Sequence, residues 1–133
     1  MFVAHASSGL RQEGQPSRSV WDGVYTEEQA KRGEALYQQE CALCHLATLT
    51  GGESAPPLAG ADFLSNWNGL TLGDLFERLR ISMPPDQPDR LSRQQKIEIL
   101  AYMLSVNKFP AGSRELPRET YALNQIRLDA TKP

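Results

Sequence analysis

Residues 41–45 read CALCH, and this short stretch contains both cysteines of the 133-residue chain. Two thiols and an imidazole at this spacing could form a redox dithiol, supply half of a zinc site, or attach a haem. A thioredoxin-like dithiol stands at the start of a helix, after a strand, within an α/β pattern. A structural zinc site needs four ligands. Haem attachment needs two thiols that add across the two vinyl groups of one porphyrin, followed by a histidine that lies under the iron.

A helix is expected directly before the CALCH stretch. Thr26 has the features of an N-cap, and Gln29, three residues later, can reach back to it in a capping box. Small or apolar residues then recur three or four apart on one helical face, at Ala30, Gly33, Tyr37 and Cys41. The spacing predicts a helix over residues 27–40, which the CALCH stretch closes.

Two further helices follow a long loop. Residues 46–70 are dense in Gly, Pro, Ser and Asn, which predicts a loop with one short helical turn near Phe63. Thr71 is expected to cap a second helix that stops before the MPP segment at 83–85. Its amphipathic stripe consists of Leu72, Leu75, Phe76 and Leu79. Ser92 with Gln95 predicts a third helix over 93–106, which is apolar almost all round and therefore deeply buried.

The chain has no strand-like alternation of any length, so the predicted fold class is all-α, with three main helices and long loops. We expect a mobile or strap-like tail at 1–20, the main domain at 21–110, and an extension at 111–133 that docks on the domain. Pro117 could open a short helix in this extension. The apolar residues available for its docking are Leu116, Leu123, Ile126 and Leu128.

The surrounding elements discriminate between the three chemistries. The CALCH stretch closes a helix in a chain without strands, which does not fit a thioredoxin-like dithiol. Cys41 and Cys44 give zinc two ligands, His45 is directly adjacent, and the only other histidine, His5, lies in the expected tail. Haem attachment requires only what the segment offers, with both cysteines bound covalently and His45 as the proximal iron ligand.

The iron also needs a sixth ligand, and a thioether is a soft, neutral one that favours ferrous iron and raises the reduction potential. Met1 is terminal, and Met103 lies in the expected buried helix, where packing is its ordinary role. Met83 stands at the end of an amphipathic helix and is held in extended backbone by two prolines. A plain apolar loop residue is the alternative interpretation, but together with a haem we favour Met83 as the second iron ligand.

The composition argues against several other classes of function. The chain is 40% hydrophobic and 23% charged with a net charge of −2, so nothing indicates a nucleic-acid partner. No apolar run is long enough to span a bilayer. Ala4-His5-Ala6 has the small-x-small form of a signal cleavage site, either by chance or because the chain was cut close to an export signal. We favour export to a bacterial periplasm, because this kind of haem attachment takes place in an exporting compartment.

Across about residues 24–110 the chain resembles a class I c-type cytochrome domain. Gly33 and Tyr37 precede the first cysteine at the positions where the family places a glycine and an aromatic residue. ILAYML at 99–104 resembles the family's C-terminal helix, in which Ile99 and Tyr102 would contact the first helix beside the glycine. The segments VWDGVYTEEQAKRGEALY, NWNGLTLGDLFERL, SMPPDQP and AYMLSVNKFPAG are similar to bacterial mono-haem domains that occur alone or fused to periplasmic quinoprotein dehydrogenases.

The resemblance implies a cytochrome c fold around one covalently bound haem c, and it adds further contacts. APPLAG at 55–60 resembles the segment whose proline carbonyl accepts the hydrogen bond of the proximal histidine, so Pro56 would be the acceptor and Leu58 a haem contact. Trp67 would donate to a haem propionate or pack against the haem edge. The other expected haem contacts are Leu75, Leu79 and Pro84. One departure from the family is Leu46, which stands where glycine is common.

The expected function is the transfer of single electrons between a periplasmic dehydrogenase and a downstream acceptor such as an oxidase or another cytochrome. The protein would be a monomer and not itself an enzyme, although it could be the electron-accepting domain of a larger oxidoreductase. Docking would use a small apolar surface near Cys41 and Pro84-Pro85, with mild salt dependence. The alternative function is a peroxidase-like haem enzyme or a sensor with a labile sixth ligand, for which the sequence offers no distal base except His5.

Overall fold

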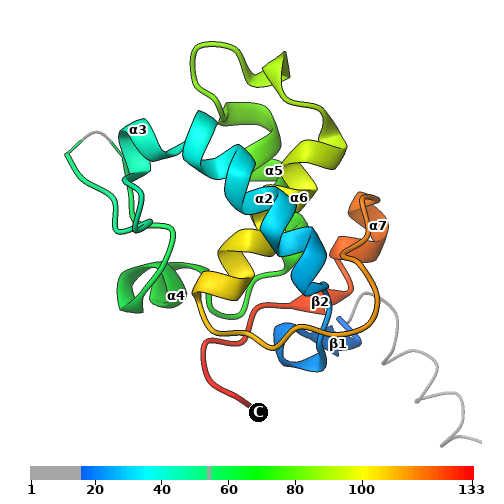
Figure 1. Ribbon diagram of the computed structural model, residues 1–133. Coiled ribbons are helices and arrows are strands. Elements are labelled where there is room, and N and C mark those ends of the chain that lie inside the picture. Colours follow the sequence, from blue (N-terminus) through cyan, green and yellow to red (C-terminus); the bar gives the residue numbers. More distant parts are fainter. Residues whose placement is uncertain (1–15, 54) are drawn as a thin grey trace, which may run out of the picture.

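Two long helices that cross each other form the centre of the molecule (Figure 1). The computed structural model describes residues 16–53 and 55–133. Helices α2 (Glu27–Glu40) and α6 (Arg93–Val106) have the bounds predicted from their caps and apolar spacing. At the crossing, a Cβ on Gly33 would lie 1.8 Å from the Glu98 carbonyl oxygen. Glycine is therefore required because the helix backbones themselves touch there. The expected contact of Tyr102 with the first helix also forms, since its ring centroid lies 5.5 Å from that of Tyr37.

The N-cap of α2 forms as predicted, but the second hydrogen bond of the predicted capping box does not. The Thr26 side chain accepts a hydrogen bond from the Gln29 backbone N–H, as expected for the cap. The Gln29 side chain does not reach back to Thr26. Instead it is fully buried, donates to the Leu116 carbonyl at 3.1 Å and accepts from the Leu116 N–H at 2.7 Å. A side chain predicted to make a local cap thus anchors the C-terminal extension, because the buried backbone of that extension needs partners.

Helix α5 (Leu72–Ser82) lies behind α2 in Figure 1 and packs against α6. Thr71 and Asp74 form a reciprocal capping box at its start, in which each side chain bonds the other's backbone N–H. The helix ends before Met83, whose backbone is extended (φ −126°, ψ 137°), because Pro84 disfavours helical backbone in the residue before it. The stop predicted at the MPP segment is confirmed.

The CALCH stretch does not simply continue α2. Cys41 has a non-helical φ of −121° (ψ −27°) and separates α2 from a four-residue helix, α3 (Ala42–His45). The long loop that follows contains α4 (Ala61–Trp67), which is two turns where one turn was expected. Figure 1 shows α3 and α4 on the same side of the α2–α6 crossing, while the segment after α5, which includes η2 (Pro88–Arg90), forms the upper edge.

The two ends of the described chain pair with each other. Strand β1 (Arg18–Ser19) runs parallel to β2 (Ile126–Arg127), and η1 (Val20–Asp22) follows β1 directly. No strand was predicted, since two residues are too few to show alternation. Val20 is fully buried, so the last residues of the expected tail at 1–20 belong to the fold. Residues 1–15 of that tail lie outside the described residues.

Residues 111–133 contribute to the same core as the helices. Helix α7 (Thr120–Leu123) begins three residues after Pro117, where a helix start was considered, and it packs on α5. The buried apolar residues of this segment are Leu116, Leu123, Ile126 and Leu128. Within residues 16–53 and 55–133, no helix combines the length and the apolar character that crossing a bilayer demands.

Candidate functional site

His45, the last residue of α3, is the centre of the site. It is 5% exposed, and its Nδ1 lies 2.8 Å from the carbonyl oxygen of Pro56. A carbonyl can only accept, so Nδ1 carries the proton and donates. The neutral ring then keeps its lone pair on Nε2, which is the atom free to bind a metal. This hydrogen bond also fixes the rotation of the imidazole about its own axis.

The loop that presents Pro56 is fastened at several points. Leu49 is buried, and its carbonyl accepts from the Leu58 N–H at 2.8 Å. Gly51 has a φ of +74°, and a Cβ there would lie 2.6 Å from the nitrogen of Pro57. The Pro56 carbonyl is therefore held in place by the shape of the loop as well as by the histidine.

Asn107, the C-cap of α6, is a site residue that sequence reasoning missed. Its amide nitrogen donates to the Leu58 carbonyl at 3.0 Å, and its Oδ1 accepts from the Gly60 N–H at 3.0 Å. The side chain is 8% exposed, so these bonds are shielded from water. Asn107 thereby ties the loop that presents Pro56, called the proximal loop below, to helix α6. Asparagine at a helix end was the only sequence signal, and many asparagines stand at helix ends without such a role.

Leu46 follows His45 in a backbone conformation that is almost exclusive to glycine. Its φ is +69° and its ψ is 155°. Three hydrogen bonds hold it there: its N–H donates to the Ala42 carbonyl, and its own carbonyl accepts from the Tyr37 hydroxyl at 2.7 Å and the Leu49 N–H at 3.0 Å. The turn expected of a glycine thus forms with leucine, which strains the backbone.

The two thiols have no disulfide between them and are partly buried. Burial, together with smaller contributions from the Glu40 carboxylate and Cys44, raises the pKa of the Cys41 thiol to about 11. Redox dithiols work through a thiol whose pKa is depressed, so this environment argues against the thioredoxin-like chemistry. Leu43, between the two cysteines, is 94% exposed and takes no part in the core.

Met83 lies on a separate element from His45. It is partly buried, and its N–H donates to the Leu79 carbonyl at 3.1 Å; the next residue, Pro84, is buried. Among the described residues, no hydrogen bond or ion pair joins Met83 to the CALCH stretch directly. Arg90 makes an indirect link, since it pairs with Asp86 in the segment after Met83 and with Glu40 at the end of α2, each at 3.0 Å.

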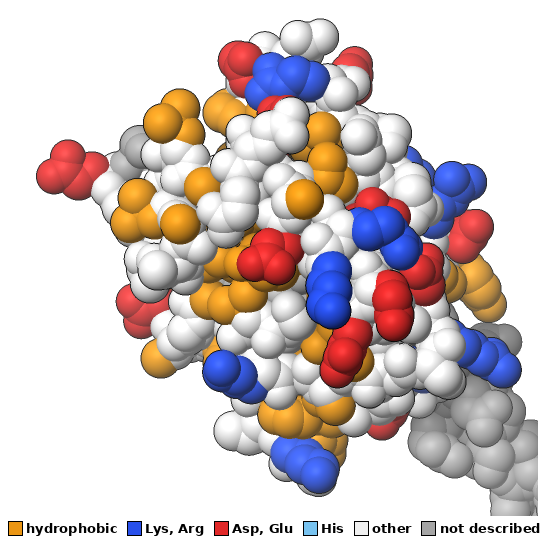
Figure 2. Space-filling view, in the orientation of Figure 1, with side chains coloured by type: hydrophobic (Ala, Val, Ile, Leu, Met, Phe, Trp, Pro, Cys, Tyr) orange, Lys and Arg blue, Asp and Glu red, His pale blue; other side chains and the backbone are white. Residues whose placement is uncertain are grey.

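Apolar side chains from α4, α5 and the loop before α4 remain only partly covered at the edge of the core. They are Leu58, Leu64, Trp67 and Leu79, whereas Leu75 is 4% exposed. The Arg78 guanidinium lies 5.9 Å from the centre of the Trp67 ring, over its face. Figure 2 shows hydrophobic side chains gathered on the left of this view, the side of α3 and α4, while charged side chains intersperse on the right.

The donor set fits a haem c. An imidazole with Nε2 available, a thioether, two unpaired thiols three residues apart and partly covered apolar side chains are the groups that such a cofactor engages. A metal ion alone fits less well, because the described residues contain no group of three or more His, Cys, Asp or Glu side chains placed to hold one.

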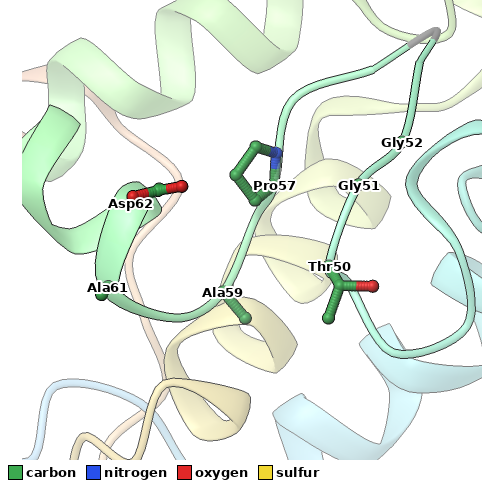
Figure 3. Close-up of a pocket in the computed structure, with 7 residues that line it drawn as sticks. All are labelled: Thr50, Gly51, Gly52, Pro57, Ala59, Ala61 and Asp62. Carbon is green, nitrogen blue, oxygen red and sulfur yellow. The ribbon is translucent and has the colours of Figure 1, made fainter.

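Figure 3 shows a depression in the surface whose lining does not include His45. It has a volume of about 390 Å³ and lies between the two arms of the proximal loop and the start of α4. Its walls are mainly backbone and small side chains, and Asp62 is the one ionisable residue among those that line it. None of its lining residues is a candidate ligand, so we place the chemistry at His45 and not in this depression.

Comparison with known proteins agrees with this geometry. The family model described as cytochrome C oxidase, cbb3-type, subunit III matches residues 28–103, which is more than half of the chain. Among solved structures, the sulfane dehydrogenase SoxCD from Paracoccus pantotrophus matches with a TM-score of 0.55 and 23% identity over 81% of this chain, which shows a shared fold. The present chain covers 61% of that chain's length. No curated protein matches. The chain therefore belongs to this family of bacterial c-type cytochrome domains, has the all-α cytochrome c fold, and binds covalently attached haem c for electron transfer.

Proposed function

We propose that this domain carries single electrons and that His45 and Met83 would be the two protein ligands of its haem iron. Cys41 and Cys44 would form the two thioether bonds to the porphyrin. The observation that carries the proposal is the 2.8 Å contact between His45 Nδ1 and the Pro56 carbonyl, which leaves Nε2 as the ligating atom. The bound haem supplies the one-electron couple between ferric and ferrous iron.

Each protein group has a defined part in this function. Pro56 orients the imidazole and, by accepting the hydrogen bond from Nδ1–H, makes Nε2 a better donor to iron. Met83 contributes a neutral, soft sulfur that favours ferrous iron over ferric iron and so raises the potential. With His45 and Met83 both bound to the iron, no position would remain for a substrate, and the domain would exchange electrons without binding or converting a molecule.

Apolar side chains would exclude water from the cofactor. Leu58, Leu75, Leu79 and Pro84 are buried or partly buried near the candidate ligands in the sequence, and we assign them to haem contacts. Low polarity around a redox centre disfavours the extra positive charge of the oxidised form, so it also raises the potential. Trp67, with the Arg78 guanidinium over one face of its ring, would either pack at the haem edge or donate to a propionate.

The partners would be two redox proteins that dock in turn. One electron enters from a periplasmic dehydrogenase, of which a quinoprotein enzyme is our preferred example, and one electron leaves to an oxidase or another cytochrome. The occurrence of the fold in a protein titled a sulfane dehydrogenase supports a dehydrogenase as donor. Leu43 and Ile81, which are 94% and 60% exposed, suit a small apolar interface of the kind that transient redox partners use. With a net charge of −2, we expect mild salt dependence of association.

Optical spectra of the haem-loaded protein test the ligation. Methionine bound to ferric haem iron gives a weak far-red charge-transfer band, so we expect this band in the wild type and its loss in Met83→Ala. The potential should also fall, because a soft ligand of ferrous iron is removed. Met103→Leu is the matched control, since Met103 is 3% exposed inside α6 and should affect packing alone.

Two results would overturn the proposal. A high-spin ferric spectrum or rapid binding of carbon monoxide to the ferrous wild type would mean that the sixth position is open. The domain would then be a haem enzyme or a sensor and not a simple carrier. Loss of the far-red band in Met103→Leu, with the band retained in Met83→Ala, would move the ligand to the other methionine.

A further inference from the structure

Lys96 is a lysine in the interior of the protein. It lies on α6 and is 2% exposed, although lysine is almost never fully buried unless its ammonium group is paired. Its Nζ donates a hydrogen bond to the main-chain carbonyl of Arg80 at 2.8 Å. Burial and, to a smaller extent, the like charge of Arg80 lower the pKa of this ammonium group, and the Asp89 carboxylate opposes that shift. The ammonium group of Lys96, which is costly to bury, is therefore hydrogen-bonded to one backbone atom, the carbonyl oxygen of Arg80.

That backbone atom is a carbonyl that the local sequence cannot satisfy. In an α-helix the carbonyl of residue i accepts from the N–H of residue i+4, so the donor for Arg80 would be residue 84. Residue 84 is Pro84, which has no N–H. The preceding carbonyls of the last turn are satisfied, because Met83 N–H donates to Leu79 and the Ser82 hydroxyl donates to Arg78.

The ammonium group of Lys96 also suits the charge at this place. The C-terminal end of a helix carries a partial negative charge from its unsatisfied carbonyls, and α5 ends at Ser82. A cation there is favourable, more so when it is screened from water. Lys96 thus supplies both the missing donor and a positive charge where the helix ends, directly before Met83.

We infer that Lys96 is a positioning residue for Met83: it replaces the hydrogen bond that Pro84 cannot make and so fixes the turn from which the proposed iron ligand emerges. This inference rests on the proposed His45 and Met83 ligation. Its consequence is that the methionine stays bound to iron because a residue thirteen positions further on, on another helix, holds the end of α5.

Imidazole competition in the haem-loaded ferric protein tests this role. Added imidazole displaces a methionine ligand, and the loss of the far-red band reports the concentration needed for half displacement. Lys96→Met keeps the length and packing of the side chain but removes the donor and the charge. We expect half displacement at about a tenfold lower imidazole concentration, the factor that corresponds to loss of one charge-assisted hydrogen bond. Lys31→Met, at an exposed position of α2, is the matched control and should titrate like the wild type.

A second background identifies the atom concerned. Pro84→Ala gives residue 84 a backbone N–H, the donor that a helix continued past Ser82 would direct at the Arg80 carbonyl. In this background the further change Lys96→Met should lower the half-displacement concentration much less than tenfold. An equal drop in both backgrounds would show that Lys96 acts on Met83 by another route, and the inference would be wrong.

The same spectra distinguish a wrong iron ligand from a wrong role for Lys96. If the wild type lacks a far-red band, or Met83→Ala retains it, the proposed ligation is wrong. If the band depends on Met83 but Lys96→Met titrates like Lys31→Met, the ligation stands and the positioning role of Lys96 is refuted.

Discussion

The strained backbone at Leu46 predicts that glycine is preferred there over alanine, the reverse of the usual order. The φ of +69° with a ψ of 155° lies in a region that only glycine occupies freely, because any Cβ crowds the backbone there. The leucine is kept in it by the hydrogen bonds of its N–H to Ala42 and of its carbonyl to Tyr37 and Leu49. The strain is thus imposed by the proximal turn and is absent from the unfolded chain.

The comparison of Leu46→Gly with Leu46→Ala isolates this strain. Both variants remove the side chain beyond Cβ, so the lost packing cancels in the difference. Relief of the strain favours glycine by ~1–3 kcal/mol. The greater freedom of glycine in the unfolded chain opposes this by ~0.4–1 kcal/mol. We therefore expect Leu46→Gly to be more stable than Leu46→Ala by roughly 1–2 kcal/mol.

Urea unfolding of the haem-loaded variants measures the difference in the free energy of unfolding. Leu43 gives the matched control pair, because it is an exposed leucine in the same stretch, within helix α3 and without a positive φ. There, glycine should be less stable than alanine by ~0.5–1 kcal/mol. The reasoning is refuted if glycine is less stable than alanine at both positions, since the backbone of Leu46 would then carry no strain that a Cβ causes.

Three further predictions concern contacts between distant parts of the chain. Gly33→Ala should destabilise the protein by roughly 1–3 kcal/mol, since the added methyl group must push α2 away from the backbone of α6. Gln29→Leu should cost about 2–4 kcal/mol, because it leaves the buried N–H and carbonyl of Leu116 without their partner. The hydrogen bond from Arg127 lowers the pKa of Asp129 below its ordinary value of 3.8, so its stabilising contribution is present above that pH and is lost as the pH falls through the lowered pKa. Asp129→Asn should accordingly flatten the fall of unfolding free energy below about pH 4.

Urea unfolding measures all three predictions, and each has a result that would contradict it. For Gly33, a gain in stability, as alanine brings in an exposed helix, would mean that the helices are not in backbone contact. For Gln29, the control is Gln38→Leu on the exposed face of the same helix, which should change stability by less than about 0.5 kcal/mol. Similar losses in both variants would contradict the anchoring role of Gln29. For Asp129, the wild type and Asp129→Asn are compared from pH 6 to pH 3, and parallel curves would show that the carboxylate is not coupled to folding.

Local patterns were enough to predict the main helices. Thr26 and Ser92 cap their helices through the N–H three residues later, and Pro84 ends the helix before it by steric exclusion. These effects act within four residues of chain, so the sequence contains both partners of each interaction. The predicted bounds of 27–40 and 93–106 are therefore confirmed to the residue.

Such local patterns could not predict the short helices and strands. Helix α4 has a glycine as its N-cap and no capping side chain, so its two turns carry no start signal in the sequence. Strands β1 and β2 have two residues each and pair across more than a hundred positions. The Gln29 side chain could have bonded the Thr26 backbone locally, but it bonds the distant Leu116 backbone. The N–H and carbonyl of Leu116 are buried against it and need an acceptor and a donor.

The sequence by itself determined which atoms are available for chemistry: two thiols and an imidazole at the spacing of CALCH, a thioether before two prolines, and the helices that end at each of them. Only the tertiary structure decided how those atoms are held. The Pro56 carbonyl on His45, Asn107 on the proximal loop and Lys96 on the end of α5 are all contacts between residues eleven or more positions apart. The residue type indicates that a buried polar group needs a hydrogen-bond partner. Which partner it finds depends on which elements pack together, and that is a property of the whole folded chain.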